Sequence, residues 1–297
     1  MVRPLLVTGR TGQLGNALAR LGHRLAVLAV GRPEFDFDRP ETIIALFNSL
    51  TPRAVVNAAA FTAVDAAESD LPGAFRANRD GPALLARLCR QADIPLIHVS
   101  TDYVFDGTKG EPYVESDPTA PLGVYGASKR AGEEEVLIAG GKAIVARTSW
   151  MISPTGRNFV RSMLTARQQT DRLTVVADQR GRPTSAWDVA AAMLSILRRI
   201  ERTGWQEPYR GVVHIAGSGE TTWHGLATAV FDLAACRGLS RPEIAAIAAA
   251  DWPSPARRPA DSRLDCSRLA EVFGLRMPLW HESLGPIVDE LLRAPNS

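Results

Sequence analysis

The stretch Leu5-Leu6-Val7-Thr8-Gly9-Arg10-Thr11-Gly12-Gln13-Leu14-Gly15 decides the fold of this chain. A short apolar run leads into glycines at positions 9, 12 and 15, and residues 17–21 can form a helix. This order predicts a strand, a tight turn and a helix. Gly12 would let the backbone approach a pyrophosphate, and Gly15 would let the helix pack closely on the strand. The glycines are spaced Gly-x-x-Gly-x-x-Gly, which is wider than the Gly-x-Gly-x-x-Gly fingerprint of dinucleotide sites. The position of this turn directly after the first strand is therefore what favours a dinucleotide site.

Beyond this turn, strands and helices are expected to alternate along the chain. The predicted strands are apolar runs at 25–30, 54–60, 96–100 and 143–147. The predicted helices between them are 40–50, 81–92 and a run that begins at Tyr125. The alternation predicts an α/β fold, a Rossmann-like doubly wound parallel sheet whose ligands bind at the carboxyl ends of the strands.

After Trp150 the pattern loosens, which predicts a smaller C-terminal lobe that binds the substrate. The segments expected there are helices at 158–167, 188–200, 223–237 and 279–293, and strands at 173–176 and 212–215. We therefore expect a cofactor-binding domain at residues 1–150 and a substrate-binding lobe at residues 151–297. The two are expected to exchange segments.

Tyr125 and Lys129 are four residues apart in a predicted helix, so they share one face of it. A free tyrosine titrates near ~10, and a cation within about 4 to 6 Å lowers that pKa. The pair therefore predicts a general acid, although two unrelated surface residues would give the same spacing. Only three of the 34 basic residues are lysines, which favours a position that requires a compact ammonium. Thr101 follows the strand at 96–100, and its hydroxyl can donate to a carbonyl oxygen or cap the backbone.

The end of the second predicted strand favours NADPH over NADH. An acid at this point would hold the ribose hydroxyls of NAD. Gly31 and Arg32 follow Val30 instead, and Arg10 lies within the glycine turn. Two guanidinium groups suit a ribose 2′-phosphate, but both arginines would also be ordinary as solvated surface charges, so NADH stays open.

Composition excludes several classes of partner. The net charge is +2, with 34 basic and 32 acidic residues and no basic run, so neither nucleic acid nor a membrane surface is expected. The three cysteines and five histidines form no ligand spacing, and no metal site is predicted. The chain shows no signal peptide and no apolar stretch of about 18 residues, so we expect a cytoplasmic protein.

With these motifs in place, the chain resembles the extended short-chain dehydrogenase/reductases, and within them the dTDP-4-dehydrorhamnose reductases. The similarity runs over nearly the whole length. The stretches that carry it are Gly-Arg-Thr-Gly-Gln-Leu-Gly (9–15), Asn-Ala-Ala-Ala-Phe-Thr-Ala-Val-Asp (57–65), Ser-Thr-Asp-Tyr-Val-Phe-Asp-Gly (100–107), Arg-Thr-Ser-Trp (147–150), Asp-Gln-Arg-Gly-Arg-Pro-Thr (178–184), and Pro-Ala-Arg-Arg-Pro with Ser-Arg-Leu (255–264).

The resemblance implies that hydride passes from NADPH to C4 of dTDP-4-dehydro-L-rhamnose, giving dTDP-L-rhamnose for cell-surface polysaccharide. It implies that Tyr125 protonates the C4 oxygen, Lys129 lowers the pKa of Tyr125 and holds the nicotinamide ribose, and Thr101 bonds the carbonyl oxygen. The positions that match substrate contacts are Thr101, Asp102, Trp150, Arg257 and Arg258. The expected cofactor contacts, with Arg32 added from its place after the second strand, are Gly9, Arg10, Gly12, Gln13, Leu14, Gly15, Arg32, Asp36, Phe37, Ala60, Phe61, Thr62, Tyr125 and Lys129.

Three other functions remain open. The first is another nucleotide-sugar 4-ketoreductase or an epimerase, although an epimerase-reductase would need a cysteine and a histidine beside the sugar. The second is a dehydratase, which would have a glutamate where this chain has Tyr103. The third is a cofactor-binding regulatory subunit without catalysis, against which the intact Thr101, Tyr125 and Lys129 argue.

The resemblance also bears on oligomeric state. Some members of the family form a dimer bridged by a metal ion that glutamates from three segments bind, since magnesium requires hard oxygen ligands. At the matching positions this chain has Ala17, Trp187 and Glu290. A single carboxylate cannot assemble that bridge, so we expect a monomer or a dimer without a metal.

Overall fold

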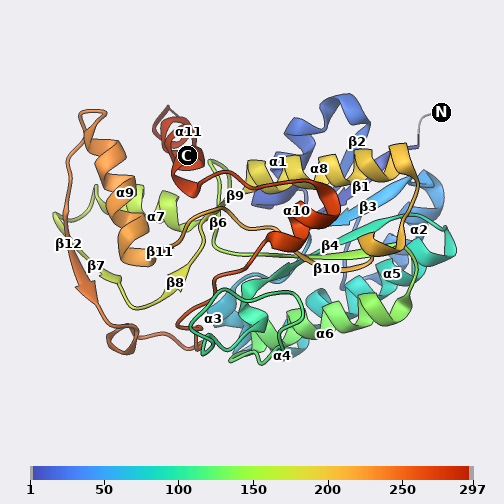
Figure 1. Ribbon diagram of the computed structural model, residues 1–297, viewed down its shortest axis with the longest axis horizontal. Helices are drawn as coiled ribbons and strands as arrows, with labels where there is room; N and C mark the ends of the chain where they lie inside the picture. Colours follow the sequence, from blue (N-terminus) through green and yellow to red (C-terminus); the bar gives the residue numbers. More distant parts are fainter. Residues whose placement is uncertain (1–2, 294–297) are drawn as a thin grey trace.

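The computed structural model describes residues 3–293, and a six-stranded parallel sheet forms its centre (Figure 1). The strands lie in the order β10-β5-β4-β3-β1-β2. Their bounds are β1 Leu5–Thr8, β2 Val27–Val30, β3 Ala54–Asn57, β4 Leu96–Thr101, β5 Ala143–Thr148 and β10 Gly211–His214. The chain moves from β1 to β2 on one side and continues with β3 on the other. The crevice for a ligand therefore opens between the carboxyl ends of β1 and β3.

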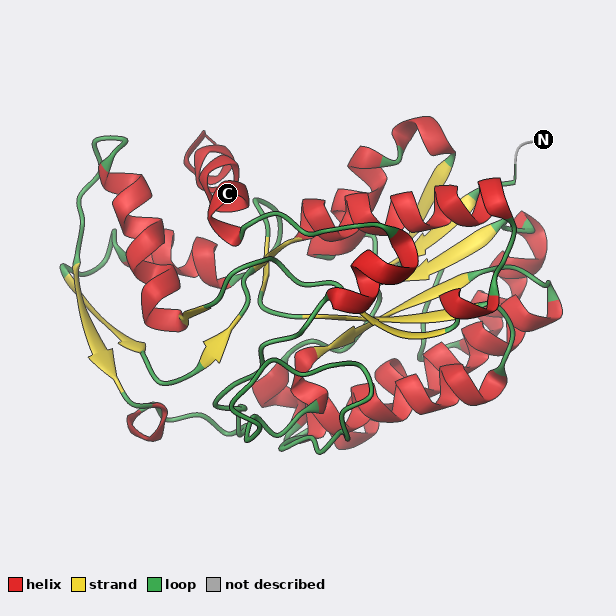
Figure 2. Ribbon diagram, in the orientation of Figure 1, coloured by secondary structure: helices red, strands yellow, loops and turns green. Residues whose placement is uncertain are grey.

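Helices cover both faces of this sheet (Figure 2). One face carries α1 Gln13–Leu21, α8 Ala186–Thr203 and α10 Ser267–Phe273, and the other carries α2 Pro40–Leu50, α5 Gly81–Gln91 and α6 Val124–Ala139. Successive strand residues point to opposite faces, so Leu5 and Val7 pack toward α1 and α8 whereas Leu6 packs toward α2 and α5. Two apolar layers therefore hold the sheet, and most of its polar side chains lie near the carboxyl ends of the strands.

The smaller lobe lies beyond the carboxyl ends of the main strands (Figure 1). Its helices are α7 Phe159–Ala166, α9 Trp223–Ala235 and α11 Trp280–Arg293, which share an apolar core that includes Ile152, Val160 and Leu226. Short strand pairs complete it: β7 Arg172–Val176 with β12 Glu243–Ile247, β8 Arg180–Gly181 with β11 Thr221–Thr222, and β6 Met151–Ile152 with β9 Thr184–Ser185.

Segments after residue 150 contribute to both parts of the molecule. β10 pairs with β5 in the main sheet, and α8 packs against α1. The doubly wound α/β prediction is confirmed, whereas the division of the chain at residue 150 stays a prediction. Within residues 3–293, no helix is both long and apolar enough to cross a membrane.

Some predicted boundaries were wrong for local reasons. The second strand begins at Val27, because Leu25 ends a 3-10 turn and Ala26 adopts a left-handed conformation with φ of 49°. The third strand ends at Asn57, after which residues 58–60 leave the sheet and pass beside Gly9. Three helices were not predicted from the sequence, namely α3 Val64–Ala67, α4 Leu71–Phe75 and α10. The π-helical turn Arg76–Asp80 was not predicted either.

Candidate active site

The glycine turn between β1 and α1 has the shape of a phosphate cradle. A Cβ on Gly9, whose φ is +79°, would lie 2.8 Å from the carbonyl oxygen of Ala58, and a Cβ on Gly15 would lie 2.1 Å from that of Gly9. Gly12 precedes α1 and offers no side chain to its first amides. These N–H groups and the positive end of the helix dipole are therefore free to face an anion. The turn fits the pyrophosphate of a dinucleotide.

The two arginines expected at the adenosine ribose lie together at the end of β2. The amide of Arg10 donates to the carbonyl oxygen of Val30. Val30 directly precedes Gly31 and Arg32, so this contact holds the glycine turn beside them. The guanidinium of Arg32 contacts Asp36 at 3.0 Å and Asp38 at 2.7 Å. Arg10 in turn lies 3.7 Å from Glu34. Each guanidinium is thus available at the surface, but each already has an acidic partner.

The remaining expected cofactor residues occupy the rim of the same crevice. The ring of Phe37 packs against Gly81, where a Cβ would lie 2.2 Å from it. The loop with Ala60, Phe61 and Thr62 is held by Asn78, whose side chain pairs with the amide and carbonyl of Phe61 at 2.8 and 3.0 Å. Asn78, wholly buried, was missed because an asparagine within a helical run gives no signal of its own.

Thr101, Tyr125 and Lys129 meet where β4 ends against the first turns of α6. The ammonium of Lys129 donates to the carbonyl oxygen of Val99 at 2.6 Å, and the hydroxyl of Thr101 donates to Asp102 Oδ1 at 3.0 Å. Lys129 and Thr101 are 2% and 6% exposed, whereas Tyr125 is only half-buried. The structure therefore brings the three predicted catalytic residues together, and Tyr125 taken as a whole residue is the most accessible of them.

A carboxylate from a distant segment anchors the start of α6. Glu68 Oε1 accepts from the amide of Val124 at 2.8 Å, which satisfies one of the free N–H groups at the helix end. The ring of Tyr103 contacts that of Tyr125 edge to face, with centroids 5.9 Å apart. These contacts fix the position of Tyr125. Glu68 was not predicted, because its partner lies 56 positions away in the chain.

Burial, rather than the charge of Lys129, sets the pKa of Tyr125. It raises that pKa to about 12, while the hydrogen bond with Thr101 opposes the rise and Asp102 adds to it. Burial lowers the pKa of Lys129 to about 8, against the effect of Glu133. The expectation that Lys129 lowers the pKa of Tyr125 was wrong for this structure, because the ammonium is directed at Val99. The neutral phenol still has the proton that a general acid needs.

Asp102 points inward from the end of β4. It is 2% exposed, and burial raises its pKa to about 7 although Thr101 donates to Oδ1 and Ser262 lies nearby. Its second oxygen, Oδ2, is buried without a hydrogen-bond partner in the part of the chain that the structure describes. The carboxyl group therefore supports Thr101 directly, and its contact with a sugar stays a prediction.

Trp150 forms one wall between the sheet and the smaller lobe. It is 8% exposed, adopts a φ of 39°, and stacks on Trp223 with ring centroids 3.6 Å apart and planes 6° from parallel. Gly181 makes this possible, since a Cβ there would lie 2.2 Å from the indole. Trp223 donates through Nε1 to Gln179 Oε1 at 3.1 Å. Trp150 is thus a packing residue, and its contact with a substrate stays a prediction.

A cavity of about 670 Å³ opens in the smaller lobe beside Trp223. Phe159, Trp223 and Trp252 line it, together with Arg257 and Arg258. Aromatic faces suit a nucleobase, and guanidinium groups suit phosphate oxygens. The aromatic residues were not predicted, since their helix and loop positions are far apart in the sequence.

The two arginines at this end of the cavity differ in their contacts. Arg257 is exposed and also lines a small hollow, about 10 Å³, that Tyr125 lines as well. Arg258 contacts both carboxylate oxygens of Asp65, at 3.0 and 3.1 Å. Arg258 therefore ties the C-terminal segment to α3, whereas the contact of Arg257 with a diphosphate stays a prediction.

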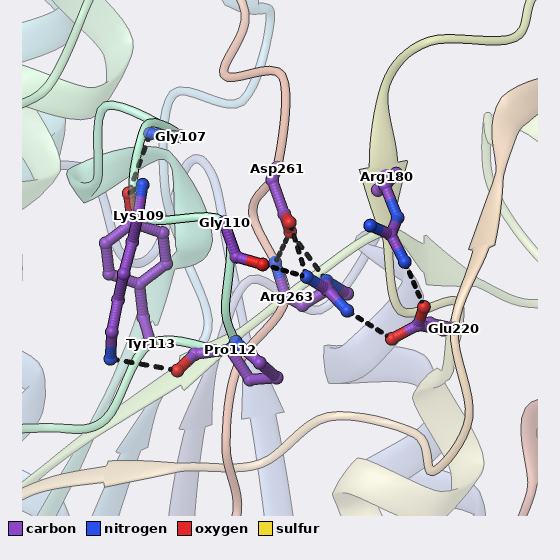
Figure 3. A network of polar contacts seen from close by, with 9 residues as sticks. All are labelled: Gly107, Lys109, Gly110, Pro112, Tyr113, Arg180, Glu220, Asp261 and Arg263. Carbon is purple, nitrogen blue, oxygen red and sulfur yellow. Dashed lines mark hydrogen bonds and ion pairs between the residues drawn. The ribbon is translucent and has the colours of Figure 1, made fainter.

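A buried arginine joins four segments next to this region (Figure 3). Arg263 is 6% exposed, contacts both oxygens of Asp261 at 2.8 and 2.6 Å, and donates to the carbonyl oxygen of Gly110 at 2.9 Å. Its third partner, Glu220 at 2.5 Å, also pairs with Arg180. Ser262 lies between Asp261 and Arg263 in the sequence, so the network holds it near Asp102 at the end of β4.

We expect Arg263→Met to lower the free energy of unfolding by about 3–5 kcal/mol, because it leaves Asp261 buried without its cation. Urea unfolding followed by tryptophan fluorescence measures the change. The matched control is Arg172→Met, since Arg172 and Glu243 are 68% and 67% exposed and 3.5 Å apart. An exposed pair contributes about 0–1 kcal/mol. Equal losses in the two variants would contradict a structural role for the network.

The three segments expected to matter for a metal bridge also lie together. Arg20 of α1, one turn after the buried Ala17, contacts Glu290 of α11 at 2.7 Å. Its guanidinium lies 5.7 Å from the ring centroid of Trp187 at the start of α8. A cation from the chain itself therefore pairs with the acid. Among residues 3–293, no group of three or more His, Cys, Asp or Glu side chains is arranged to hold a metal ion.

The fold and the site together define a class of protein. A doubly wound parallel sheet with a glycine turn after β1, and a Tyr-x-x-x-Lys pair on the helix before β5, is the arrangement of the extended short-chain dehydrogenase/reductases. The chain belongs to the family of the RmlD substrate binding domain, whose sequence model matches residues 3–293. The resemblance found in the sequence is confirmed.

Known relatives match over nearly their whole length. A dTDP-4-dehydrorhamnose reductase from Sinorhizobium fredii is 44% identical, with 97% of each chain covered. A probable dTDP-4,6-dihydroxy-2-methyloxan-3-one 4-ketoreductase from Streptomyces antibioticus is 38% identical, covering 97% of this chain and 96% of that one. The crystal structure of a dTDP-4-dehydrorhamnose reductase from Bacillus anthracis in complex with NADP has a TM-score of 0.88 and 28% identity, and covers 98% of this chain and all of that one.

Proposed function

We propose that this chain reduces dTDP-4-dehydro-β-L-rhamnose at C4 with hydride from NADPH, giving dTDP-L-rhamnose. The position of Arg257 carries this proposal, because this residue lines both the aromatic cavity and the hollow beside Tyr125. A nucleotide in the cavity would then reach the phenol with its sugar, and its diphosphate would lie at Arg257. The relatives' names supply the identity of the sugar.

NADPH, when bound along the glycine turn, supplies the hydride. The protein contributes two groups at the carbonyl. Tyr125 donates its proton to the C4 oxygen as negative charge develops there, and Thr101 donates a hydrogen bond to the same oxygen after its hydroxyl turns away from Asp102 Oδ1. Lys129 holds the nicotinamide ribose from the floor of the crevice. Trp150 closes the sugar side of the site.

The cofactor preference is expected to depend on Arg32. NADPH should bind more tightly than NADH, and Arg32→Asp should erase or reverse the difference, since a charged hydrogen bond contributes about 1.5–3 kcal/mol or roughly tenfold or more in affinity. Fluorescence titration with both cofactors measures this, with Arg39→Asp as a control on the same loop. Tighter binding of NADH by the unmutated protein would show that Arg10 and Arg32 do not recognise the 2′-phosphate.

Oligomeric state and metal independence follow as a further expectation. Because Arg20 already pairs with Glu290, the protein should be a monomer or a dimer without a metal. Sedimentation and turnover should both be unchanged after exhaustive chelation. A dimer that dissociates with the chelator, or turnover that returns only with magnesium, would contradict this. Cytoplasmic location and the absence of nucleic-acid or membrane partners stay predictions.

The Streptomyces relative favours a second candidate, a 4-ketoreductase that acts on a different dTDP-linked ketosugar. The purified protein should be incubated with NADPH and a panel of nucleotide 4-keto-6-deoxy sugars, and the loss of absorbance at the reduced nicotinamide recorded. The proposal expects the fastest loss with dTDP-4-dehydro-L-rhamnose. A faster reaction with another sugar would favour the second candidate, and no reaction with any sugar would favour a regulatory subunit.

A further inference from the structure

Tyr125, Lys129 and Glu133 follow one another at spacings of four residues along α6. This spacing places them on one face of the helix, toward β4 and β5. Lys129 is 2% exposed and Glu133 is 3% exposed. The two turns after the phenol therefore carry a buried cation and then a buried anion.

Glu133 also serves a second buried cation. Its two carboxylate oxygens accept from Nε and Nη2 of Arg147 on β5, at 2.9 and 2.6 Å. Arg147 faces His214 at 3.5 Å, and His214 Nδ1 lies 3.0 Å from the carbonyl oxygen of Asp265. A carbonyl can only accept, so Nδ1 holds the proton and Nε2 accepts from Arg147. Burial lowers the pKa of His214 to about 3, which leaves it neutral.

His98, on β4 beside Lys129, cannot supply a negative charge and is itself neutral. The amide of Ala59 donates to Thr8 Oγ1 at 3.0 Å, so the hydroxyl of Thr8 donates onward to Asn57 Oδ1 at 2.6 Å. The amide nitrogen of Asn57 then donates to His98 Nδ1 at 3.0 Å. The proton of His98 is therefore on Nε2. Burial and the nearby Lys129 hold the pKa of His98 well below its usual range.

The other groups packed around Lys129 leave Glu133 as its counter-charge within the described chain. Tyr125 keeps its proton, since its pKa is raised to about 12. Asp102, with a pKa raised to about 7, is directed at Thr101 and Ser262. Asn78, near the same helix, is uncharged. Two buried cations, Lys129 and Arg147, thus share the single buried carboxylate of Glu133.

We propose that Glu133 is a positioning residue that keeps Lys129 in its ammonium form and thereby ready to hold the nicotinamide ribose. This proposal rests on the proposed function and adds to it a residue one helical turn beyond Lys129 that supports the same site. If the charge of Glu133 is removed, two cations remain buried together. Arg147 does not release a proton in proteins, so Lys129 is the group that becomes neutral.

Direct titration of Lys129 tests this without any sugar substrate. The chain contains only three lysines, so protein made with 13Cε-lysine gives three lysine signals, with Lys109 and Lys142 as internal references. The wild-type midpoint of Lys129 should lie near 8. Glu133→Gln should lower it by about one pH unit or more. Glu134→Gln is the matched control, since Glu134 is the next residue, 53% exposed and paired with Arg130 on the surface.

A second variant separates this role from a purely structural one. Glu133→Gln leaves Arg147 buried without a carboxylate and is expected to be less stable, whereas Glu133→Gln combined with Arg147→Met replaces the pair by uncharged groups and should regain thermal stability. The double variant should keep a midpoint below the wild-type value, because it too lacks the carboxylate one helical turn from Lys129, although it also lacks the charge of Arg147. Glu133→Asp should restore most of the wild-type midpoint.

A wild-type midpoint for Lys129 in Glu133→Gln, or in the stable double variant, would overturn the proposal. NADPH binding, measured by fluorescence over the same pH range, gives a second readout. As the pH is raised, NADPH affinity should begin to fall at a lower pH in both variants than in the wild type. A wild-type protein that reduces no sugar would defeat the proposed function, while these two titrations would still decide the role of Glu133.

Discussion

Tyr125→Phe is expected to lower kcat by roughly 10²–10⁴, the range that general acid catalysis contributes. The reason is that the phenol, whose pKa is raised to about 12, holds a proton at neutral pH and is the half-buried member of the three residues at the end of β4. NADPH affinity should remain close to wild type, because the aromatic ring and its contact with Tyr103 are retained. Steady-state turnover and fluorescence titration measure the two quantities.

The control for this variant is Tyr209→Phe. Tyr209 is also buried and hydrogen-bonded, but it contacts Arg199 and Thr203 under α8. It should retain wild-type turnover. A Tyr125→Phe protein that turned over as fast as the wild type would remove Tyr125 from the proton transfer.

Lys129→Met should weaken both turnover and NADPH binding. It removes a charge that is buried in the floor of the crevice, and a charged hydrogen bond contributes about 1.5–3 kcal/mol, so we expect NADPH affinity to fall roughly tenfold to a hundredfold. Turnover at saturating NADPH should fall by roughly 10² or more, because the ribose is no longer held against the substrate. Both losses are measured as a function of NADPH concentration.

Lys142→Met provides the comparison, since Lys142 pairs with Asp93 on the surface at 2.7 Å. It should change neither quantity. A Lys129→Met protein that lost turnover but bound NADPH normally would contradict the double role of Lys129.

Sequence patterns predicted the parts of the site that depend on one strand and the residues directly after it. The glycine turn follows β1, Thr101 ends β4, and the pair on α6 has helical spacing, so each could be placed from local order alone. Parallel strands then bring these ends to one edge of the sheet. The same reasoning found Arg10 and Arg32, although not the acids that pair with them.

The residues that sequence patterns did not predict depend on contacts between distant segments. Glu68 caps α6 from 56 positions away, and Arg263 contacts Glu220 and Gly110 across 43 and 153 positions. The pKa of Tyr125 was predicted in the wrong direction for a related reason. The i, i+4 spacing gives the proximity of Lys129 but not the burial around both groups or the carbonyl of Val99 that receives the ammonium.

Hydride transfer by this chain to C4 of a dTDP-linked ketosugar can be followed with an isotope label. The protein should be incubated with dTDP-4-dehydro-L-rhamnose and NADPH that carries deuterium at both C4 positions of the nicotinamide, and the product examined by mass spectrometry and proton NMR. We expect dTDP-L-rhamnose with one deuterium, located at C4 of the sugar, from the wild-type protein and almost none from Tyr125→Phe. A product that carries no deuterium, or carries it at another carbon, would contradict this expectation.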